Sequence, residues 1–222
     1  MALIEAPVFQ RPDIKILRQN GRAGTAGCVV RRVSDNQLYL LSNAHVMGWA
    51  GNPAKDQGVV LIADGPNGAV RPIADLGEND WSPRLGASGT QRFDAAIAKL
   101  RDQNDPAIQR IGKPKIMSTI IKEGMAVSMT GARSGGPIHS VLIDATFDLE
   151  LKLHRFDGKD IPYKFNPLFL CRKPFSIPGD SGSAVYDANG ALIGLSLGGS
   201  PAGSVFCSAE LIFERFGLVA AG

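Results

Sequence analysis

Short apolar runs separated by glycine and proline dominate the sequence, and few stretches show the apolar spacing of an amphipathic helix. Strands need only about four to eight residues, whereas helices need longer periodic segments, so this pattern predicts an all-β protein with many tight turns. The 26 glycines and 14 prolines are scattered along the whole chain, where they can supply those turns. We expect strands at Thr25–Val33, Gln37–Ser42, Gly58–Ala63, Val70–Leu76, Ala95–Leu100, Ala126–Met129, Ile138–Glu150, Tyr163–Leu170, Ala184–Asp187, Leu192–Leu197 and Ser204–Cys207.

Two turns and two short helices can be located within this pattern. Ser34–Asn36 and Asp187–Gly190 are predicted hairpin turns, the second because Asn-Gly readily adopts positive φ. Asp105 and Pro106 can cap and open a helix, so a short helical turn is expected after them. The stretch SAELIFERFGLV has apolar residues at helical spacing, with Ser208 as its cap, and predicts a C-terminal helix.

The charged and irregular stretch from Arg101 to Lys122 is predicted to connect two β-rich halves. Each half contains several short strands, and a small sheet hides its edges by closing into a barrel. No repeat of fixed period points to another organisation. The expected division is an N-terminal extension (1–20), an N-terminal barrel (21–100), a connector (101–122), a C-terminal barrel (123–208) and a C-terminal helix (209–222).

Length and charge limit the classes of function. The 222 residues carry a formal net charge of +3 and no dense run of lysine and arginine, so nucleic-acid binding is not expected. No stretch of about 18 apolar residues occurs, which predicts no membrane span. The first residues lack the early positive charge and unbroken apolar run of a secretion signal, so we expect a cytoplasmic protein.

Cysteine and histidine usage disfavours disulfides and metal sites. The three cysteines, Cys28, Cys171 and Cys207, are too few and odd in number for a disulfide framework, so buried free thiols are expected. A bridge between Cys171 and Cys207 stays open at this stage. The three histidines are far apart in the sequence, and neither HExxH nor CxxC occurs, so we expect no metal and no cofactor.

The octapeptide PGDSGSAV, residues 178–185, raises the question of whether Ser181 is a nucleophile. A serine hydroxyl needs a base, usually histidine, and that base needs a carboxylate to orient it. His45 follows the apolar strand in YLLSNAHV, and Asp94 precedes the apolar strand in FDAAIAKL, so both are expected at rigid strand ends. Gly179 permits backbone geometry that other residues resist, and its N–H and that of Ser181 can point together at a developing oxyanion.

The order of these residues along the chain discriminates between folds. An α/β-hydrolase would need a histidine after Ser181, and none follows it. A subtilisin-like order would need Asp13 or Asp35, and neither precedes a strong apolar strand. The observed order His45, Asp94, Ser181 is that of chymotrypsin. GDSG alone is typical of any tight turn, but the conjunction of three such blocks predicts a catalytic triad.

YLLSNAHV, FDAAIAKL and PGDSGSAVYDANGALIG resemble, in this order, the three motif blocks of the trypsin-like (chymotrypsin-fold) serine proteases, and in detail bacterial members without disulfides. The resemblance covers most of the chain. It implies two perpendicular six-stranded antiparallel β-barrels with a short C-terminal helix, and a site in the cleft between them. It also implies roles: His45 as general base and acid, Asp94 as its orienting group, Ser181 as nucleophile, and the amides of Gly179 and Ser181 as the oxyanion hole.

The resemblance also locates a specificity pocket and shows two departures. Phe175 would lie near the base of the pocket, with Gly199 and Ser204 on its walls. Because no carboxylate stands at Phe175, we expect a small or medium apolar side chain before the cut rather than lysine or arginine. Val46 replaces the bridged cysteine that secreted members usually carry after the histidine. No activation-cleavage site is evident near the start, so Asp180, which pairs with the new amine in many animal members, is expected to need another partner or to stay solvated.

We therefore expect a serine endopeptidase that acts, as a monomer, on a protein or peptide substrate through an acyl-enzyme intermediate. One alternative of another class stays open: a protease-like binding module, or a latent protease that a dedicated partner protein activates. A fold does not fix function, and an intact triad argues against lost chemistry but not against latency.

Overall fold

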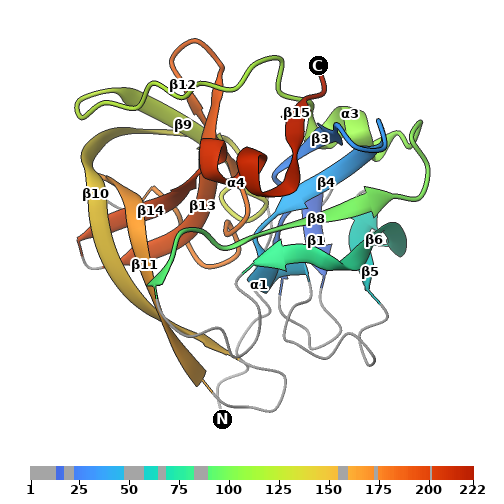
Figure 1. The fold of residues 1–222 in the computed structure, drawn as a ribbon, viewed down its shortest axis with the longest axis horizontal. Coiled ribbons are helices and arrows are strands. Elements are labelled where there is room, and N and C mark those ends of the chain that lie inside the picture. Colours follow the sequence, from blue (N-terminus) through green and yellow to red (C-terminus); the bar gives the residue numbers. More distant parts are fainter. Residues whose placement is uncertain are drawn as a thin grey trace.

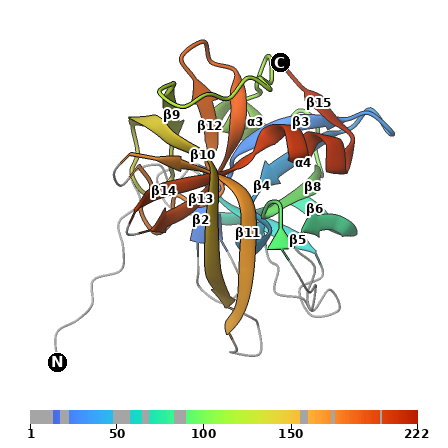
Figure 2. The same ribbon diagram turned by 60° about the vertical axis from the view of Figure 1, so that its left-hand side comes forward.

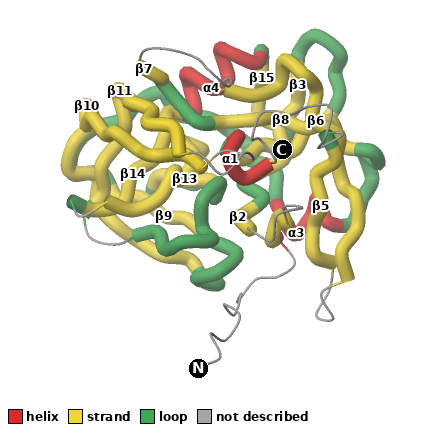
Figure 3. The backbone as a smooth tube through the Cα atoms, turned by 90° about the horizontal axis from the view of Figure 1, so that it is seen from below, coloured by secondary structure: helices red, strands yellow, loops and turns green. Residues whose placement is uncertain are grey.

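A computed structural model describes residues 14–17, 23–47, 58–64, 69–82, 90–154, 160–172, 175–200 and 202–222. The described chain forms two β-sheets, one made mainly from its first half and one from its second half, packed against each other (Figure 1). Seen from below, the short helix α1 (Ala44–Met47) lies between the two sheets (Figure 3).

The first sheet closes into a barrel because two of its strands are one bent segment. Only Ala26 and Gly27 separate β2 from β3, and β2 pairs with β1 while β3 pairs with β4. Counted as one strand, β2 and β3 complete a six-stranded ring with β4, β8, β6, β5 and β1, and β15 adds to the edge of β3. The strands are β1 (Lys15–Leu17), β2 (Ala23–Thr25), β3 (Cys28–Arg32), β4 (Leu38–Ser42), β5 (Val59–Asp64), β6 (Ala69–Ser82), β8 (Ala95–Leu100) and β15 (Leu218–Ala220).

The second sheet is also a closed ring of six strands. It runs in the order β10, β9, β12, β13, β14 and β11, and β10 pairs again with β11, while β7 adds outside β11 as its parallel neighbour. The β10–β11 hairpin extends well beyond the body of the barrel (Figure 2). The strands are β7 (Thr90–Gln91), β9 (Ala126–Thr130), β10 (Pro137–His154), β11 (Asp160–Cys171), β12 (Ala184–Asp187), β13 (Leu192–Ser200) and β14 (Gly203–Ser208). The predicted fold of two six-stranded barrels is thus confirmed.

Both faces of the central strands are buried, because one faces a barrel interior and the other faces the second barrel. In β4, Leu40 packs inside the first barrel, whereas Tyr39 and Leu41 belong to a cluster that also contains Leu195 and Cys207 of the second barrel. The sequence LYLLS of β4 therefore reads as a continuous apolar run, and all five residues are buried. This packing holds the two barrels against each other at the strand ends that carry the candidate site.

The two helices expected from capping signals are present. α3 (Ala107–Ile111) begins after Asp105, whose carboxylate accepts a hydrogen bond from the N–H of Ala107 at 2.8 Å. α4 (Ala209–Phe216) begins at Ser208, whose hydroxyl accepts from the N–H of Leu211. The helix expected over residues 209–222 is shorter, since Gly217 adopts a left-handed φ of 62° and the chain continues as β15.

Every expected strand overlaps an observed strand, but β6 extends to Ser82 and β10 to His154, beyond the expected ends at Leu76 and Glu150, and one expected strand is interrupted. The strand expected over Thr25–Val33 is interrupted after Thr25, because Gly27 packs so closely on the turn at Gly182 that a Cβ would lie 2.4 Å from the Gly182 carbonyl oxygen. The short strands β1, β7 and β15, and the first two residues of β2, were not expected. In the described part of the chain, no helix has the length and apolar character required to cross a membrane.

Candidate active site

His45 is presented by a single helical turn at the end of β4. The carbonyl of Asn43 accepts hydrogen bonds from the N–H groups of Val46 and Met47, at 3.1 and 3.0 Å, and so starts α1 directly after the strand. Ala44, Val46 and Met47 are buried in this turn, whereas the side chain of His45 is 24% exposed. The imidazole therefore stands on a packed base and remains accessible.

Asp94 lies just before β8 and is fully buried, with each of its polar groups hydrogen-bonded. Its carboxylate accepts from the imidazole Nδ1 of His45 and from the backbone N–H of His45, the latter at 3.2 Å. Its carbonyl accepts from the Asn43 side-chain amide at 2.7 Å, and its N–H donates to the sulfur of Cys207 at 3.4 Å. The structure thus brings together His45 and Asp94, which the sequence places 49 residues apart.

This pairing fixes the tautomer of the imidazole. A carboxylate can only accept, so Nδ1 carries the proton and Nε2 keeps the lone pair that a general base needs. A buried carboxylate also stabilises the imidazolium that forms when the base takes a proton.

The turn that carries Ser181 is pressed against the strand end that leads to His45. Gly182, at φ 91°, has no room for a side chain, because a Cβ would lie 2.1 Å from the Ser42 hydroxyl oxygen. A Cβ on Gly24 would likewise meet both a Val46 methyl group at 2.5 Å and the Ser181 carbonyl at 3.0 Å. Gly24 therefore packs against both Ser181 and Val46, the residue that follows His45 in the helical turn.

The hydroxyl of Ser181 donates a hydrogen bond to the carbonyl of Leu197 on β13, at 3.2 Å. In the described part of the chain it has no hydrogen bond to the imidazole of His45. The structure thus places the nucleophile candidate beside the base candidate, with the serine side chain directed to a different acceptor.

Both N–H groups of the predicted oxyanion hole are free of protein acceptors within the described residues. The N–H groups of Asp180 and Gly182 donate to carbonyls of Ile177 and Ser196, but those of Gly179 and Ser181 donate to none. Gly179 itself has φ 108°, a conformation that favours glycine. Alternate amides of this turn are therefore available to a ligand.

The structure gives Asp180 a partner that the sequence did not reveal. Its side chain is fully buried, and one carboxylate oxygen accepts from the N–H groups of Arg133 and Ser134 at 3.1 and 3.0 Å, while the other accepts from the N–H of Ile177 at 3.2 Å. A Cβ on Gly131 would lie 2.1 Å from this carboxylate. Three backbone N–H groups thus hold the carboxylate of Asp180 in its buried position.

The three residues predicted for the specificity pocket have different environments. Phe175 is 2% exposed and packs in the core of the second barrel. Ser204 is fully buried, and its hydroxyl oxygen accepts from the N–H groups of Phe175 and Ser176, at 2.7 and 2.8 Å. Gly199, the cross-strand partner of Ser204, is exposed. Of the three, only Gly199 presents an accessible surface.

All three cysteines are free and buried. Burial raises the pKa of the Cys28 thiol and that of the Cys171 thiol to about 12 each. Cys171 packs in the core of the second barrel, whereas Cys207 packs between the barrels, so the bridge left open by the sequence is not formed. The described residues contain no cluster of side chains that could hold a metal ion.

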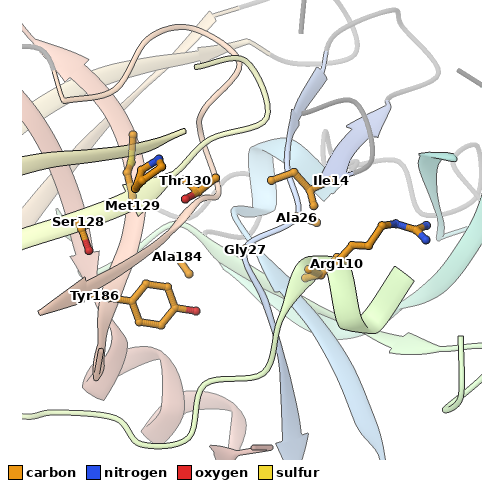
Figure 4. Close-up of a pocket in the computed structure, with 11 residues that line it drawn as sticks. Ile14, Ala26, Gly27, Arg110, Ser128, Met129, Thr130, Ala184 and Tyr186 are labelled. Carbon is orange, nitrogen blue, oxygen red and sulfur yellow. The ribbon is translucent and has the colours of Figure 1, made fainter. Parts of the chain in front are cut away.

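A separate cavity of about 210 Å³ lies where the barrels meet (Figure 4). Ile14, Ala26 and Arg110 line it from one side, and Met129 and Tyr186 from the other. None of the residues predicted for the active site lines this cavity, so it is distinct from the His45–Asp94 pair.

Comparisons with known proteins show the class of fold. No protein-family model matches the sequence, and no curated protein matches it either. A glutamic acid-specific serine protease of known structure is 14% identical, with a TM-score of 0.61 over 95% of this chain and 99% of that chain. Protease A of Thermobifida fusca (14% identity, TM-score 0.58, 96% and 98% covered) and the chymotrypsin of Cellulomonas bogoriensis (14%, 0.56, 96% and 98%) are similar as well.

The chain therefore has the double-barrel fold of the chymotrypsin-like serine proteases. At this identity the likeness concerns the fold alone. What the site does has to be argued from its own residues.

Proposed function

We propose that the protein is a serine endopeptidase in which Ser181 is the nucleophile, His45 the general base and Asp94 the group that orients it. The observation that carries this proposal is the buried carboxylate of Asp94 hydrogen-bonded to the Nδ1 of His45. Beside it lies a turn that bears a serine and two N–H groups with no acceptor among the described residues. The carboxylate of Asp94 contacts both the ring and the backbone of His45, so it fixes the position of the imidazole.

The proposed reaction uses these groups in order. Ser181 Oγ attacks the scissile carbonyl while His45 Nε2 accepts its proton, and the N–H groups of Gly179 and Ser181 stabilise the oxyanion. His45 then protonates the leaving amine as the carbon–nitrogen bond breaks. A water molecule, deprotonated by His45, hydrolyses the acyl-enzyme and regenerates the serine.

This reaction requires the Ser181 side chain to leave the carbonyl of Leu197. One rotation about its first side-chain torsion exchanges this acceptor for another, and nucleophile–base hydrogen bonds commonly tighten only in the substrate complex. The bond to Leu197 is between two neutral groups, so its net stabilisation, about 0.5–1.5 kcal/mol, is small beside the barrier of the reaction.

The enzyme is proposed to need no activating cleavage. In proteases activated by cleavage, a new terminal amine pairs with the acid before the nucleophile, whereas here the amides of Ile177, Arg133 and Ser134 already hold Asp180. This contact supports a turn that is assembled as the chain folds.

A protein or peptide is the proposed substrate, and the proposed preference is for a small or medium apolar side chain before the cut. The absence of a carboxylate at Phe175 supports this preference. A single methylene in an apolar pocket discriminates by only about 1–3 kcal/mol, so the preference should be modest.

A latent protease is the second candidate, and one observation favours it: the Ser181 hydroxyl is bonded to Leu197 rather than to His45. In that case a dedicated partner protein would reorient the serine. Monomeric state and a reducing cytoplasmic compartment stay predictions, the latter supported by three buried free thiols.

The test is intact-mass measurement after incubation with a fluorophosphonate, which reacts only with an activated serine. Wild type should gain one adduct, and Ser181→Ala none. His45→Ala should lose the adduct while keeping the fold by circular dichroism. Persistence of labelling in Ser181→Ala would overturn the assignment, and absence of labelling in the wild type that is restored by a cell extract would favour latency.

A further inference from the structure

Thr25, the last residue of β2, connects the first barrel to the turn of the nucleophile through an unusual number of hydrogen bonds. It is fully buried. Its N–H donates to the carbonyl of Ser181 at 2.8 Å, and its hydroxyl donates to the carbonyl of Gly179 at 3.0 Å. Thr25 thereby holds both residues whose N–H groups form the proposed oxyanion hole.

The same hydroxyl also accepts a hydrogen bond from the second barrel. The N–H of Ala132 donates to Thr25 Oγ1 at 2.9 Å, and the next two N–H groups, of Arg133 and Ser134, donate to the carboxylate of Asp180. Three consecutive amides of one turn therefore hold the nucleophile turn, one of them through Thr25. The carbonyl of Thr25 is in turn fixed by the Ser42 hydroxyl at 2.7 Å.

A further contact acts on the peptide that carries the Gly179 N–H. The Arg133 guanidinium donates to the carbonyl of Pro178 at 2.9 Å. In a trans peptide the C=O and the following N–H point in opposite directions, so this bond directs the Gly179 N–H away from Arg133. Thr25 anchors the same residue at its other peptide.

We propose that Thr25 is a positioning residue for catalysis, whose hydroxyl holds the turn 178–181 in the conformation that keeps the Gly179 and Ser181 amides free. This inference rests on the proposed function. The hydroxyl is needed because it is donor and acceptor at once: it bridges an acceptor in the nucleophile turn and a donor in the 131–134 turn. Valine has nearly the same shape but neither capacity.

The test compares Thr25→Val, which removes the hydroxyl and keeps the branched shape, with Thr25→Ser, which keeps the hydroxyl. Loss of one oxyanion donor costs about 10²–10³ in kcat, so loosening the turn should lower the kcat of Thr25→Val by about tenfold or more. The KM should stay within about twofold, because Thr25 is buried and does not contact the substrate. Thr25→Ser should stay within about threefold of wild type.

A matched control separates positioning from general stability. Ser208→Ala also removes a buried hydroxyl, the cap of α4, away from the nucleophile turn. It should lower the melting temperature but leave kcat unchanged, when all variants are assayed well below their melting temperatures. Equal kcat in Thr25→Val and wild type, or an equal loss in Thr25→Ser and Thr25→Val, would overturn the inference.

Failure of the proposed function can be recognised independently. If the wild type is not labelled by fluorophosphonate, hydrogen exchange of the peptide spanning residues 176–183, measured by mass spectrometry, still tests whether the Thr25 hydroxyl holds this turn. Faster exchange in Thr25→Val, but not in Thr25→Ser, supports the positioning role, and unchanged exchange in both contradicts it.

Discussion

Replacement of Asp180 by asparagine should lower both the free energy of unfolding of the protein and its kcat. The carboxylate accepts three backbone N–H groups in full burial, two on one oxygen and one on the other. Asparagine retains one oxygen for two of the donors but turns an NH₂ group toward the third. A donor then faces the N–H of Ile177, or faces those of Arg133 and Ser134 if the amide is flipped.

The magnitude follows from these contacts. A hydrogen bond to a charged group contributes about 1.5–3 kcal/mol, and an unsatisfied buried donor costs about 1–3 kcal/mol. Loss of one bond, with two others weakened by the missing charge, gives an expected destabilisation of about 2–4 kcal/mol. Because Asp180 adjoins both proposed oxyanion donors, kcat should fall as well.

Urea unfolding followed by fluorescence, together with kcat on a peptide ester, checks this expectation. Asp102→Asn is the matched control, since Asp102 makes the same kind of bond to a backbone N–H, of Asn104 at 2.8 Å, in an exposed turn. The control should change stability by no more than about 0.5 kcal/mol. If Asp180→Asn proved as stable and active as the control, the backbone N–H groups of Ile177, Arg133 and Ser134 would not be what holds the turn 178–181.

Three further outcomes are expected. The Arg71 guanidinium holds the pKa of Asp105 below its ordinary value, so this carboxylate stabilises the fold above pH about 3.9 and loses that effect as pH falls through its lowered pKa. Asp105→Asn should therefore lower the melting temperature at pH 7, and the difference from wild type should vanish in strong acid; a gap that persists there would contradict the linkage. The thiols of Cys28 and Cys171, with pKa values of about 12, should react with an aromatic disulfide only after unfolding, and rapid titration of native protein would refute their burial. Gly182→Ala should lower the free energy of unfolding by about 1–3 kcal/mol from the positive φ alone, and further because the new methyl group overlaps Ser42. The variant should also lose fluorophosphonate labelling. A urea unfolding curve equal to that of wild type would refute this packing.

The sequence predicts the fold well because its signals are local and agree with one another. Apolar runs, the Asn-Gly turn and the caps Asp105 and Ser208 each act within a few residues, and each appears in the structure. The strands of two or three residues were missed, since so few positions carry no period. β15 in particular depends on its partner β3, far away in the sequence.

The candidate site is less accessible from the sequence, because its supporting contacts are long-range. His45 and Asp94 could be expected together from their motif blocks. No local pattern shows that Cys207 accepts from the Asp94 N–H, or that amides near Arg133 hold Asp180. Such contacts use backbone groups, which every residue has, and so they leave no signature in the choice of amino acid.

The pairing of β15 with β3 makes the barrels interdependent in folding. Leu218 to Ala220 complete the edge of a sheet whose other strands come from the first hundred residues. The last strand of the first barrel lies after the second barrel and α4 in the sequence, so the first barrel cannot complete its strand pairs without the C-terminal end of the chain. This long-range pairing raises the contact order of the whole chain. A nick in the connector would not release two independent halves, and the protein should melt in a single cooperative transition.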